Sequence, residues 1–64
     1  MIFWIFRKDK AGTMVTSHQK FHTHAEVRRY GHQDPTVWKI VIQNDDETEQ
    51  IIFQREESEL IPYF

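Results

Sequence analysis

The absence of cysteine from a chain of only 64 residues limits how this sequence can fold. A domain of this length buries only about 60 % of the surface its unfolded chain exposes, so small domains usually need disulfides, a metal or a partner. Without cysteine, disulfides and thiolate zinc sites are excluded. Nine aromatic residues favour a core of large rings instead, because each ring can bury about 150–250 Å². We therefore expect one small domain over residues 1–64, which a dimer would stabilise further.

The first part of the chain is typical of a β-hairpin. Residues 2–7 are β-branched and aromatic on both alternating faces, which predicts a central strand covered on both sides. The polar stretch that follows ends in Gly12, as a hairpin loop with a left-handed residue does. Residues 13–16 are then expected to return as a second strand.

A short helix is predicted next. Thr23 and Glu26 have the spacing of a capping box, and Gly31 stands where a glycine commonly follows a helix. The sequence therefore predicts a helix over 24–30, with an earlier start at Ser17 as the main alternative. A helix this short must pack on the sheet to be stable.

The second half of the chain predicts another hairpin. Residues 37–43 and 49–55 alternate on either side of the polar stretch 44–48, and we expect Ile51 and Phe53 to face the same way. In the first of these strands the simple alternation places Trp38, Ile40 and Ile42 on one face and Val37, Lys39 and Val41 on the other.

The end of the chain completes the expected fold. Residues 56–59 fit a turn or a short helical segment, and the apolar residues 60–64, with Pro62, fit an edge or a docked extension. The prediction is an α+β fold in ββαββ order. It consists of a small antiparallel sheet of two hairpins, about four strands, with one helix packed on a face.

The charge of the chain is divided between its two halves. Residues 1–32 carry six basic and two acidic side chains, a net charge of +4, together with all four histidines. Residues 33–64 carry two basic and eight acidic side chains, a net charge of −6. Such a polarised surface steers charged partners, or copies of itself, over a Debye length of about 8–10 Å. A homodimer that pairs the two regions would be self-complementary.

The acidic half suggests the first functional hypothesis. Carboxylates at the predicted hairpin tip can occupy a basic groove of a protein partner, and exposed aromatic residues can complete the contact. We expect a small non-enzymatic module that binds a protein partner or itself and acts as a stoichiometric inhibitor or regulator, of the kind that viruses and mobile elements also carry. The expected contact residues are Asp45, Asp46, Glu47, Glu49, Trp38 and Tyr63. The alternative role of the acids is to keep a hydrophobic sheet soluble.

The basic half suggests a second hypothesis, a nucleic-acid-binding module. Cations there are interleaved with aromatic residues, which suits phosphate neutralisation and base stacking. The residues concerned are Arg7, Lys8, Lys10, Lys20, Arg28, Arg29 and Tyr30. A pI near 6.0 argues against this class, whose domains are usually basic.

No catalytic or cofactor signature is found. His18, His22, His24 and His32 could hold a metal only if the fold gathers them, and no carboxylate or cysteine stands at a recognised ligand spacing. We therefore expect no enzyme activity, cofactor, bound metal or small-molecule substrate. The apolar stretch 1–6 is far shorter than the roughly 20 residues of a spanning helix, so we expect no membrane association and a cytoplasmic location.

Overall fold

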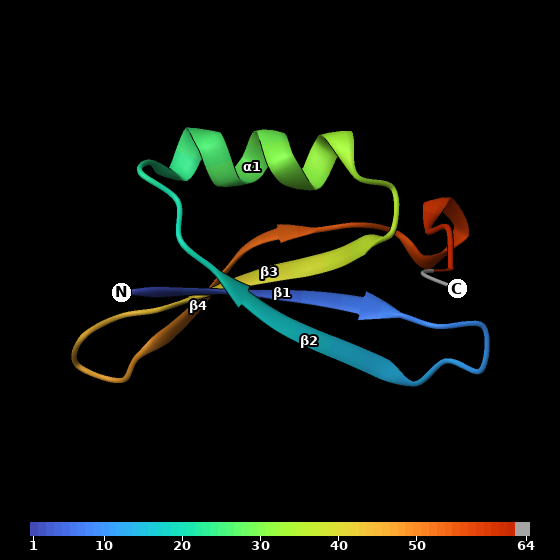
Figure 1. Cartoon of the computed structure of the whole chain (residues 1–64), viewed down its shortest axis with the longest axis horizontal. Helices are drawn as coiled ribbons and strands as arrows, with labels where there is room; N and C mark the ends of the chain where they lie inside the picture. The colour runs from blue at the N-terminus through green and yellow to red at the C-terminus, as the bar shows by residue number, and fades with distance from the viewer. Residues whose placement is uncertain (63–64) are drawn as a thin grey trace.

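A computed structural model of the chain describes residues 1–62, and it has a four-stranded antiparallel sheet with one helix packed on it (Figure 1). The strand order is β2-β1-β3-β4. The predicted α+β fold and its ββαββ order are confirmed. In chain order the elements are β1 (Ile2–Lys8), β2 (Met14–Gln19), α1 (His24–Gln33), β3 (Val37–Gln43), β4 (Glu49–Gln54) and the 3₁₀ helix η1 (Glu57–Glu59).

Both hairpins are closed by the same kind of turn. In the β1–β2 turn the Asp9 amide donates to the carbonyl of Thr13 at 3.1 Å, and Gly12 has a φ of +83°. The β3–β4 turn, over 44–48, has the same pattern of backbone hydrogen bonds, but Glu47 occupies the left-handed position with a φ of +70°. This conformation favours glycine, so the second turn carries backbone strain that the first does not.

The strands differ from the expected lengths in the first hairpin. β2 extends to Gln19 rather than ending at residue 16, because Ser17 pairs with Ile5 and Gln19 with Phe3. The alternative helix start at Ser17 is therefore wrong. β1 is central, as predicted, but the helix covers only one of its two faces.

Helix α1 begins where the sequence predicts and ends later. The Glu26 amide donates to the Thr23 hydroxyl at 3.1 Å, which confirms the N-terminal cap. The helix continues through Gly31 to Gln33, so the prediction that Gly31 ends it is wrong. Gly31 is buried, and a Cβ atom there would lie 3.0 Å from ring carbons of Phe53. The glycine therefore permits close packing of the helix on β4.

Two register shifts overturn the expected alternation in the second hairpin. One lies between Phe6 and Arg7 of β1 opposite β3, and the other between Ile40 and Val41 of β3 opposite β4. Because of these bulges Val37 lies beneath the helix with Ile40 and Ile42, whereas Trp38 contacts lysine side chains on the other face. On β4, Phe53 packs against the core while Ile51 remains 53 % exposed. The prediction that these two residues face the same way is therefore wrong.

The hydrophobic core lies between α1 and one face of the sheet. Its fully buried members are Phe3, Ile5, Val27, Val37, Ile40 and Ile42, with Phe21, Tyr30, Ile52 and Phe53 packed against them. Among residues 1–62, no helix or strand lies over the opposite face of the sheet (Figure 1).

The segment after β4 runs back along the end of the sheet. The predicted short helical segment is confirmed as η1, and the Ile61 amide donates to the carbonyl of Pro35 at 3.0 Å. This contact supports a docked extension over residues 60–62. Tyr63 and Phe64 lie outside the described residues.

Candidate interaction surface

The strand order places the two parts of the chain that differ in charge side by side in one sheet. β1 and β2 lie side by side, and residues 1–20 carry four basic side chains and one acidic one. β3 and β4 form the other side, and residues 37–62 carry two basic and seven acidic side chains. Most of these charges lie in the turns and flanking segments, because β2 carries no lysine, arginine or acid and β3 carries Lys39 and no acid. The two sides also meet, since Met1 pairs with Asp45 and Lys8 with Glu57.

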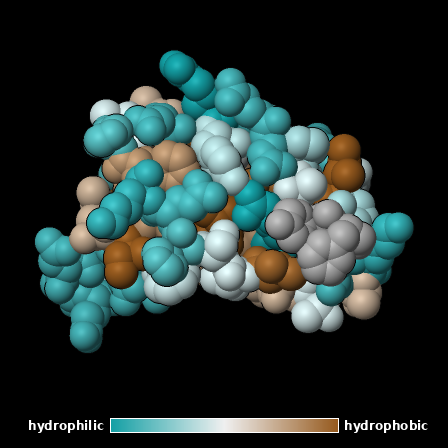
Figure 2. All heavy atoms as spheres, in the orientation of Figure 1, coloured by the Kyte–Doolittle hydropathy of each residue, from teal (hydrophilic) through white to brown (hydrophobic). Residues whose placement is uncertain are grey.

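The face of the sheet opposite α1, which we call the open face, carries several large apolar side chains. Its position follows from the register, because Trp4 pairs with His18 on one side and with Val41 on the other. The apolar residues of the open face are Ile2, Trp4, Phe6, Met14, Trp38, Val41 and Ile51. Hydrophilic side chains gather at the tip of the β3–β4 hairpin, whereas hydrophobic side chains interrupt the surface along the sheet (Figure 2).

The rings of the open face are partly held in place by polar neighbours. The Trp4 indole donates to the Gln43 side chain at 3.0 Å, and its ring meets the His18 ring at 5.4 Å between centroids. Lys39 Nζ lies 4.9 Å from the centre of the Phe6 ring and 4.8 Å from that of Trp38. In these cation–π contacts the ammonium group of Lys39 is attracted to the faces of both rings. Part of each ring face is therefore already covered.

Lys8 belongs to the same face but is also paired with an acid. Its Nζ lies 4.2 Å from the centre of the Trp38 ring and forms an ion pair with Glu57. The contact with Lys8 lowers the pKa of Glu57, so this exposed carboxylate stays ionised at neutral pH. Lys39 differs from Lys8 in this respect, because its described contacts are with the Phe6 and Trp38 rings and not with an acid.

The acidic hairpin tip is solvent-exposed. Asp45 is 93 % exposed and accepts from the Met1 amino group at 2.7 Å, while Asp46 accepts from the backbone and hydroxyl of Thr48. The hydrogen bonds from Thr48 lower the pKa of Asp46. The tip therefore presents the ionised carboxylate of Asp46 to solvent, beside the exposed Asp45 and Glu47.

The structure separates the members of the first predicted contact set. Asp45, Asp46 and Glu47 lie at the hairpin tip and Glu49 at the adjoining start of β4, whereas Trp38 lies near the other end of β3. At about 3.3 Å per residue, β3 separates them by roughly 20 Å. Tyr63 lies outside the described residues. The open face lies between the two groups. It adds Trp4, Phe6 and Ile51, which the predicted contact set did not include, although the alternation in residues 2–7 places the first two on one face.

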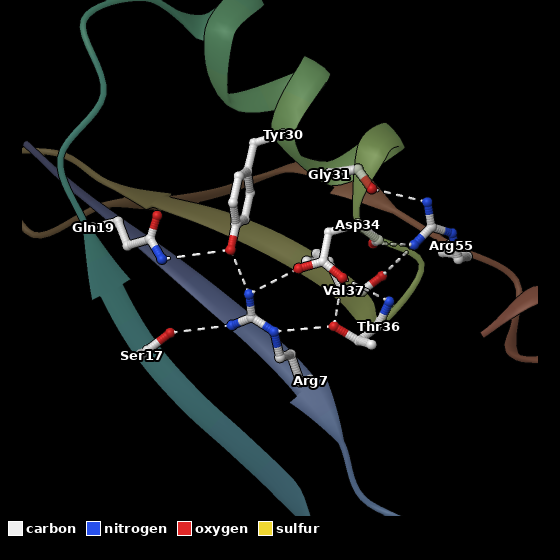
Figure 3. A network of polar contacts seen from close by, with 9 residues as sticks. All are labelled: Arg7, Ser17, Gln19, Tyr30, Gly31, Asp34, Thr36, Val37 and Arg55. Atoms are coloured by element: carbon white, nitrogen blue, oxygen red, sulfur yellow. Dashed lines mark hydrogen bonds and ion pairs between the residues drawn. The ribbon is translucent and has the colours of Figure 1, made fainter. Parts of the chain in front are cut away.

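Two residues of the second predicted set form part of an internal network instead (Figure 3). Arg7 is only 8 % exposed. Its guanidinium donates to the Tyr30 hydroxyl, to Asp34 at 3.2 Å and to Thr36 at 3.2 Å, with a longer contact to Ser17 at 3.4 Å. Arg7 and Tyr30 thus link β1 to the helix, with Arg7 buried and Tyr30 half-buried.

The charges in this network stabilise each other. Burial by itself lowers the pKa of Arg7, but its hydrogen bonds and charge interactions with Asp34 and Tyr30 outweigh that effect and raise it. Burial likewise favours the neutral form of Asp34, yet hydrogen bonds from Thr36 and Arg7 lower its pKa. Both groups are therefore ionised at neutral pH and act as structural links.

A second internal cation holds the end of the helix. Arg55 donates to the carbonyls of Asp34 at 2.7 Å, Gly31 at 2.8 Å and Val37 at 3.0 Å. These carbonyls lie at and just beyond the C-terminus of α1, where a cation also opposes the helix dipole. Sequence reasoning gave Arg55 no role, because its partners are 18 to 24 residues away.

The other cations of the second set do not form one patch. Arg28 and Arg29 are exposed on α1, which covers the opposite side of the sheet from the open face. Lys10 lies in the β1–β2 turn, and Lys20 follows β2 at the other end of the sheet. Only Lys8 of that set lies on the open face.

The histidines point in different directions. His18 contacts Trp4, His24 contacts Phe3 and His32 contacts Phe53. Within residues 1–62 there is no group of three or more histidine, cysteine or acidic side chains placed to hold a metal. The described part of the chain also has no helix that is long and apolar enough to cross a membrane.

An open hollow of about 410 Å³ lies at the Trp38 end of β3. Its lining is Trp38, Gln54, Arg55, Glu56 and Glu57. Arg55 is engaged by the helix carbonyls and Glu57 by Lys8, so these groups already have partners. The hollow therefore lies at one edge of the open face. Its lining residues do not pair a nucleophile with a base.

The comparisons with known proteins give no relative. No family model matches the sequence, and no curated protein or solved structure was found to be similar.

Proposed function

We propose that this chain is a small non-enzymatic protein-interaction module that acts by stoichiometric binding, as an inhibitor or regulator of its partner. The observation that carries the proposal is the open face, which presents Trp4, Phe6, Trp38 and Ile51 on the side of the sheet opposite the helix.

Burial of this face supplies the binding energy. Removing apolar surface from water is worth about 25 cal/mol per Å², and aromatic residues are enriched at the centres of protein interfaces. The face is rigid because its two central strands are paired on both sides, so little conformational entropy is lost when a partner binds.

The acidic hairpin tip supplies long-range attraction. Asp45, Asp46, Glu47 and Glu49 adjoin one end of the open face, and clustered charges of one sign increase association rates with a complementary partner at low salt. We expect the tip to govern the association rate and the open face to govern the dissociation rate.

The experiment compares two matched variants in a binding assay. Ile51→Lys alters the open face, and Ile61→Lys makes the same change outside the sheet at a residue with the same 53 % exposure. Tagged wild-type protein is used to capture partners from the cell that encodes it, and each captured protein is then purified and titrated directly. A partner that binds the wild type and Ile61→Lys but loses at least tenfold in affinity with Ile51→Lys supports the proposal. Equal binding by both variants contradicts it.

The role of the tip is tested with the same purified partner. Neutralising Asp45, Asp46, Glu47 and Glu49 to the corresponding amides should weaken binding and reduce its dependence on salt. Unchanged affinity in this variant would show that the acidic tip does not contact the partner.

One observation favours nucleic-acid binding as a second candidate. Lys8 and Lys39 lie beside the half-buried rings of Phe6 and Trp38 on the open face, and cations beside rings on a sheet suit the stacking of unpaired bases. This candidate predicts binding of labelled single-stranded DNA or RNA that weakens steeply between about 50 and 200 mM salt. Lys39→Gln should flatten the salt slope, whereas the helix double variant Arg28→Ala, Arg29→Ala should leave it unchanged. No binding at the lowest salt would eliminate this candidate.

A further inference from the structure

We infer that the outer edge of β2 binds an extended segment of the partner protein as a further antiparallel strand of the sheet. The inference rests on the proposed function, because it names the part of the partner that meets the sheet beside the open face. It follows from the strand order, in which β2 and β4 are the two edge strands, and from the difference between those edges.

The β1–β2 turn shows which backbone groups of β2 point outward. Asp9 donates to the carbonyl of Thr13, the residue opposite it, and in an antiparallel ladder such bonded pairs alternate with pairs that share no hydrogen bond. The next pair, Lys8 with Met14, is therefore of the second kind. Every second residue of β2 directs its amide and carbonyl away from β1, and these residues are Met14, Thr16 and His18.

The outward groups form a row that suits an extended chain. No turn or loop within residues 1–62 makes a backbone hydrogen bond to Met14, Thr16 or His18. Alternate residues of a strand lie about 6.6 Å apart, since each residue rises about 3.3 Å. Another extended backbone has donors and acceptors at the same spacing, so strand addition is the mode of binding that this row favours.

The other edge of the sheet carries features that discourage strand addition. Ile52 is an extra residue of β4 in its pairing with β3, Glu49 begins β4 and Arg55 follows it. Bulges and charges of this kind protect edge strands from pairing with other chains. By contrast, β2 has six consecutive pairs with β1 and contains no lysine, arginine, acid or proline. The β2 edge is therefore the one open to another strand.

The β2 edge is continuous with the open face. Thr16 pairs with Phe6 and His18 with Trp4, so residues with outward backbone groups also carry their side chains on that face. An added strand would place every second side chain beside them. We expect those side chains to be apolar, because they extend the apolar surface of the open face.

The available area favours a partner protein over a second copy of this chain. The rim of a six-residue strand is about 20 Å long and about 10 Å thick, so pairing β2 with β2 of a second copy would bury about 200 Å² from each. This is far below the roughly 1,200 Å² of specific interfaces. A partner that adds a strand at β2 and continues over the open face buries the strand and the face together.

Lys20 gives the added strand a preference for charge. It follows β2 directly, is exposed, and forms no ion pair within the described part of the chain, residues 1–62. Neighbouring strands of this sheet are antiparallel throughout. The N-terminal end of an antiparallel added strand lies beside Lys20, so we expect acidic residues there.

The first experiment measures amide hydrogen exchange in the free protein by NMR. Amides that bond to a neighbouring strand exchange slowly, whereas outward amides of an edge strand exchange rapidly. We expect rapid exchange at Thr16 and slow exchange at Val15 and Ser17. Slow exchange of Thr16 in the free protein would overturn the inference, because a second copy or another segment would then cover the edge.

The second experiment titrates the labelled protein with a synthetic peptide that has two glutamates followed by six alternating valines and threonines. We expect a Kd on the order of 1 mM, with the largest resonance shifts at the outward amides of β2 and with slower exchange of Thr16. The same peptide with lysines in place of the glutamates should bind the wild type about threefold more weakly, and the two peptides should bind Lys20→Gln equally. Absence of shifts in β2 at about 5 mM peptide rejects the added strand, and an unchanged preference in Lys20→Gln rejects its antiparallel placement.

Two variants of one residue separate the backbone from the side chain. Thr16→Pro removes an outward N–H without removing a bond to β1, whereas Thr16→Val keeps the N–H and the β-branched shape. With matching circular dichroism spectra, Thr16→Pro should lose the peptide binding and Thr16→Val should bind within about twofold of the wild type. Equal binding by both overturns the inference. If Thr16→Pro does not fold, the exchange and titration of the wild type decide.

The outcomes also separate this inference from the proposed function. The peptide should bind Ile51→Lys as it binds the wild type, because two strands separate β2 from β4. A captured partner that requires Ile51 but leaves Thr16 exchanging rapidly retains the interaction module and rejects the added strand. Peptide binding at β2, with no captured partner that requires Ile51, retains the added strand and rejects the open face.

Discussion

Arg7 shows how a single residue can change its expected role once the fold places it. It was expected in a cationic surface, yet it is 8 % exposed and donates to three side-chain oxygens between β1 and the helix. Buried ion pairs of this kind add little net stability when intact, but the loss of one partner leaves an uncompensated charge. Protonation of Asp34 should therefore reduce the stability of the fold more than protonation of an ordinary surface carboxylate does.

We expect Asp34 to make the protein sensitive to acid. Its pKa in the folded state is lower than the ordinary 3.8, so the stabilisation it contributes is fully present above that value and is lost as the pH falls through the folded pKa. The free energy of unfolding, measured with urea between pH 5 and 2, should fall below about pH 4. Asp34→Asn should be less stable at pH 7 and should show a shallower pH dependence. An unchanged slope would show that Asp46 and Glu57, whose pKa values are also lowered, account for the acid sensitivity.

Glu47 offers a stabilising substitution. With φ at +70° it adopts the left-handed conformation that costs a non-glycine residue about 1 kcal/mol, and the equivalent position of the other hairpin is Gly12. Glu47→Gly should therefore raise the free energy of unfolding by up to about 1 kcal/mol. Gly12→Ala is the reciprocal control and should lower it. Urea unfolding measures both, and a destabilised Glu47→Gly would contradict the assignment of strain.

At the scale of whole elements, the sequence predicts the type of each element better than the direction of its side chains. The alternation in 37–43 and 49–55 correctly indicates two strands, but each bulge inserts one residue and reverses the facing of those beyond it. Trp38 and Ile51 therefore lie on the open face, against the prediction. The pairing that produces a bulge involves another strand, so it cannot be inferred from the local pattern.

The end of the helix depends on its packing in the same way. Gly31 resembles a terminating glycine in sequence, but its place is explained by the Phe53 ring 3.0 Å from where its Cβ would be. Gly31→Ala gains about 1 kcal/mol in helix propensity and costs about 1–3 kcal/mol in overpacking. We expect a net loss of stability of roughly 1 kcal/mol.

A double-variant cycle tests this interpretation. In a Phe53→Ala background the ring is absent, and Gly31→Ala should become neutral or stabilising when urea unfolding is measured for all four proteins. If Gly31→Ala is equally destabilising in both backgrounds, the contact with Phe53 is not the reason for the glycine.

At the scale of the whole molecule, the fold brings the two oppositely charged halves of the chain into contact. The sequence shows a net charge of +4 in one half and −6 in the other, but not how the halves lie in space. In the structure Met1 pairs with Asp45 and Lys8 pairs with Glu57. These partners lie 44 and 49 residues apart in the chain, so the contacts between the two halves could not be derived from the sequence alone.

A dimer that stabilises so small a domain would be visible in the thermal stability of the protein. Because association adds free energy to the folded state alone, the Tm of a dimer that dissociates on unfolding rises with protein concentration. If the open face binds a second copy, the Tm of the wild type and of Ile61→Lys should rise by several degrees between about 1 and 100 μM. The Tm of Ile51→Lys should be lower and independent of concentration, since its open face cannot bury the partner's apolar residues. A wild-type Tm that does not change with concentration would show that the sheet with its single helix is stable as a monomer, and that its aromatic core suffices without cysteine, metal or partner.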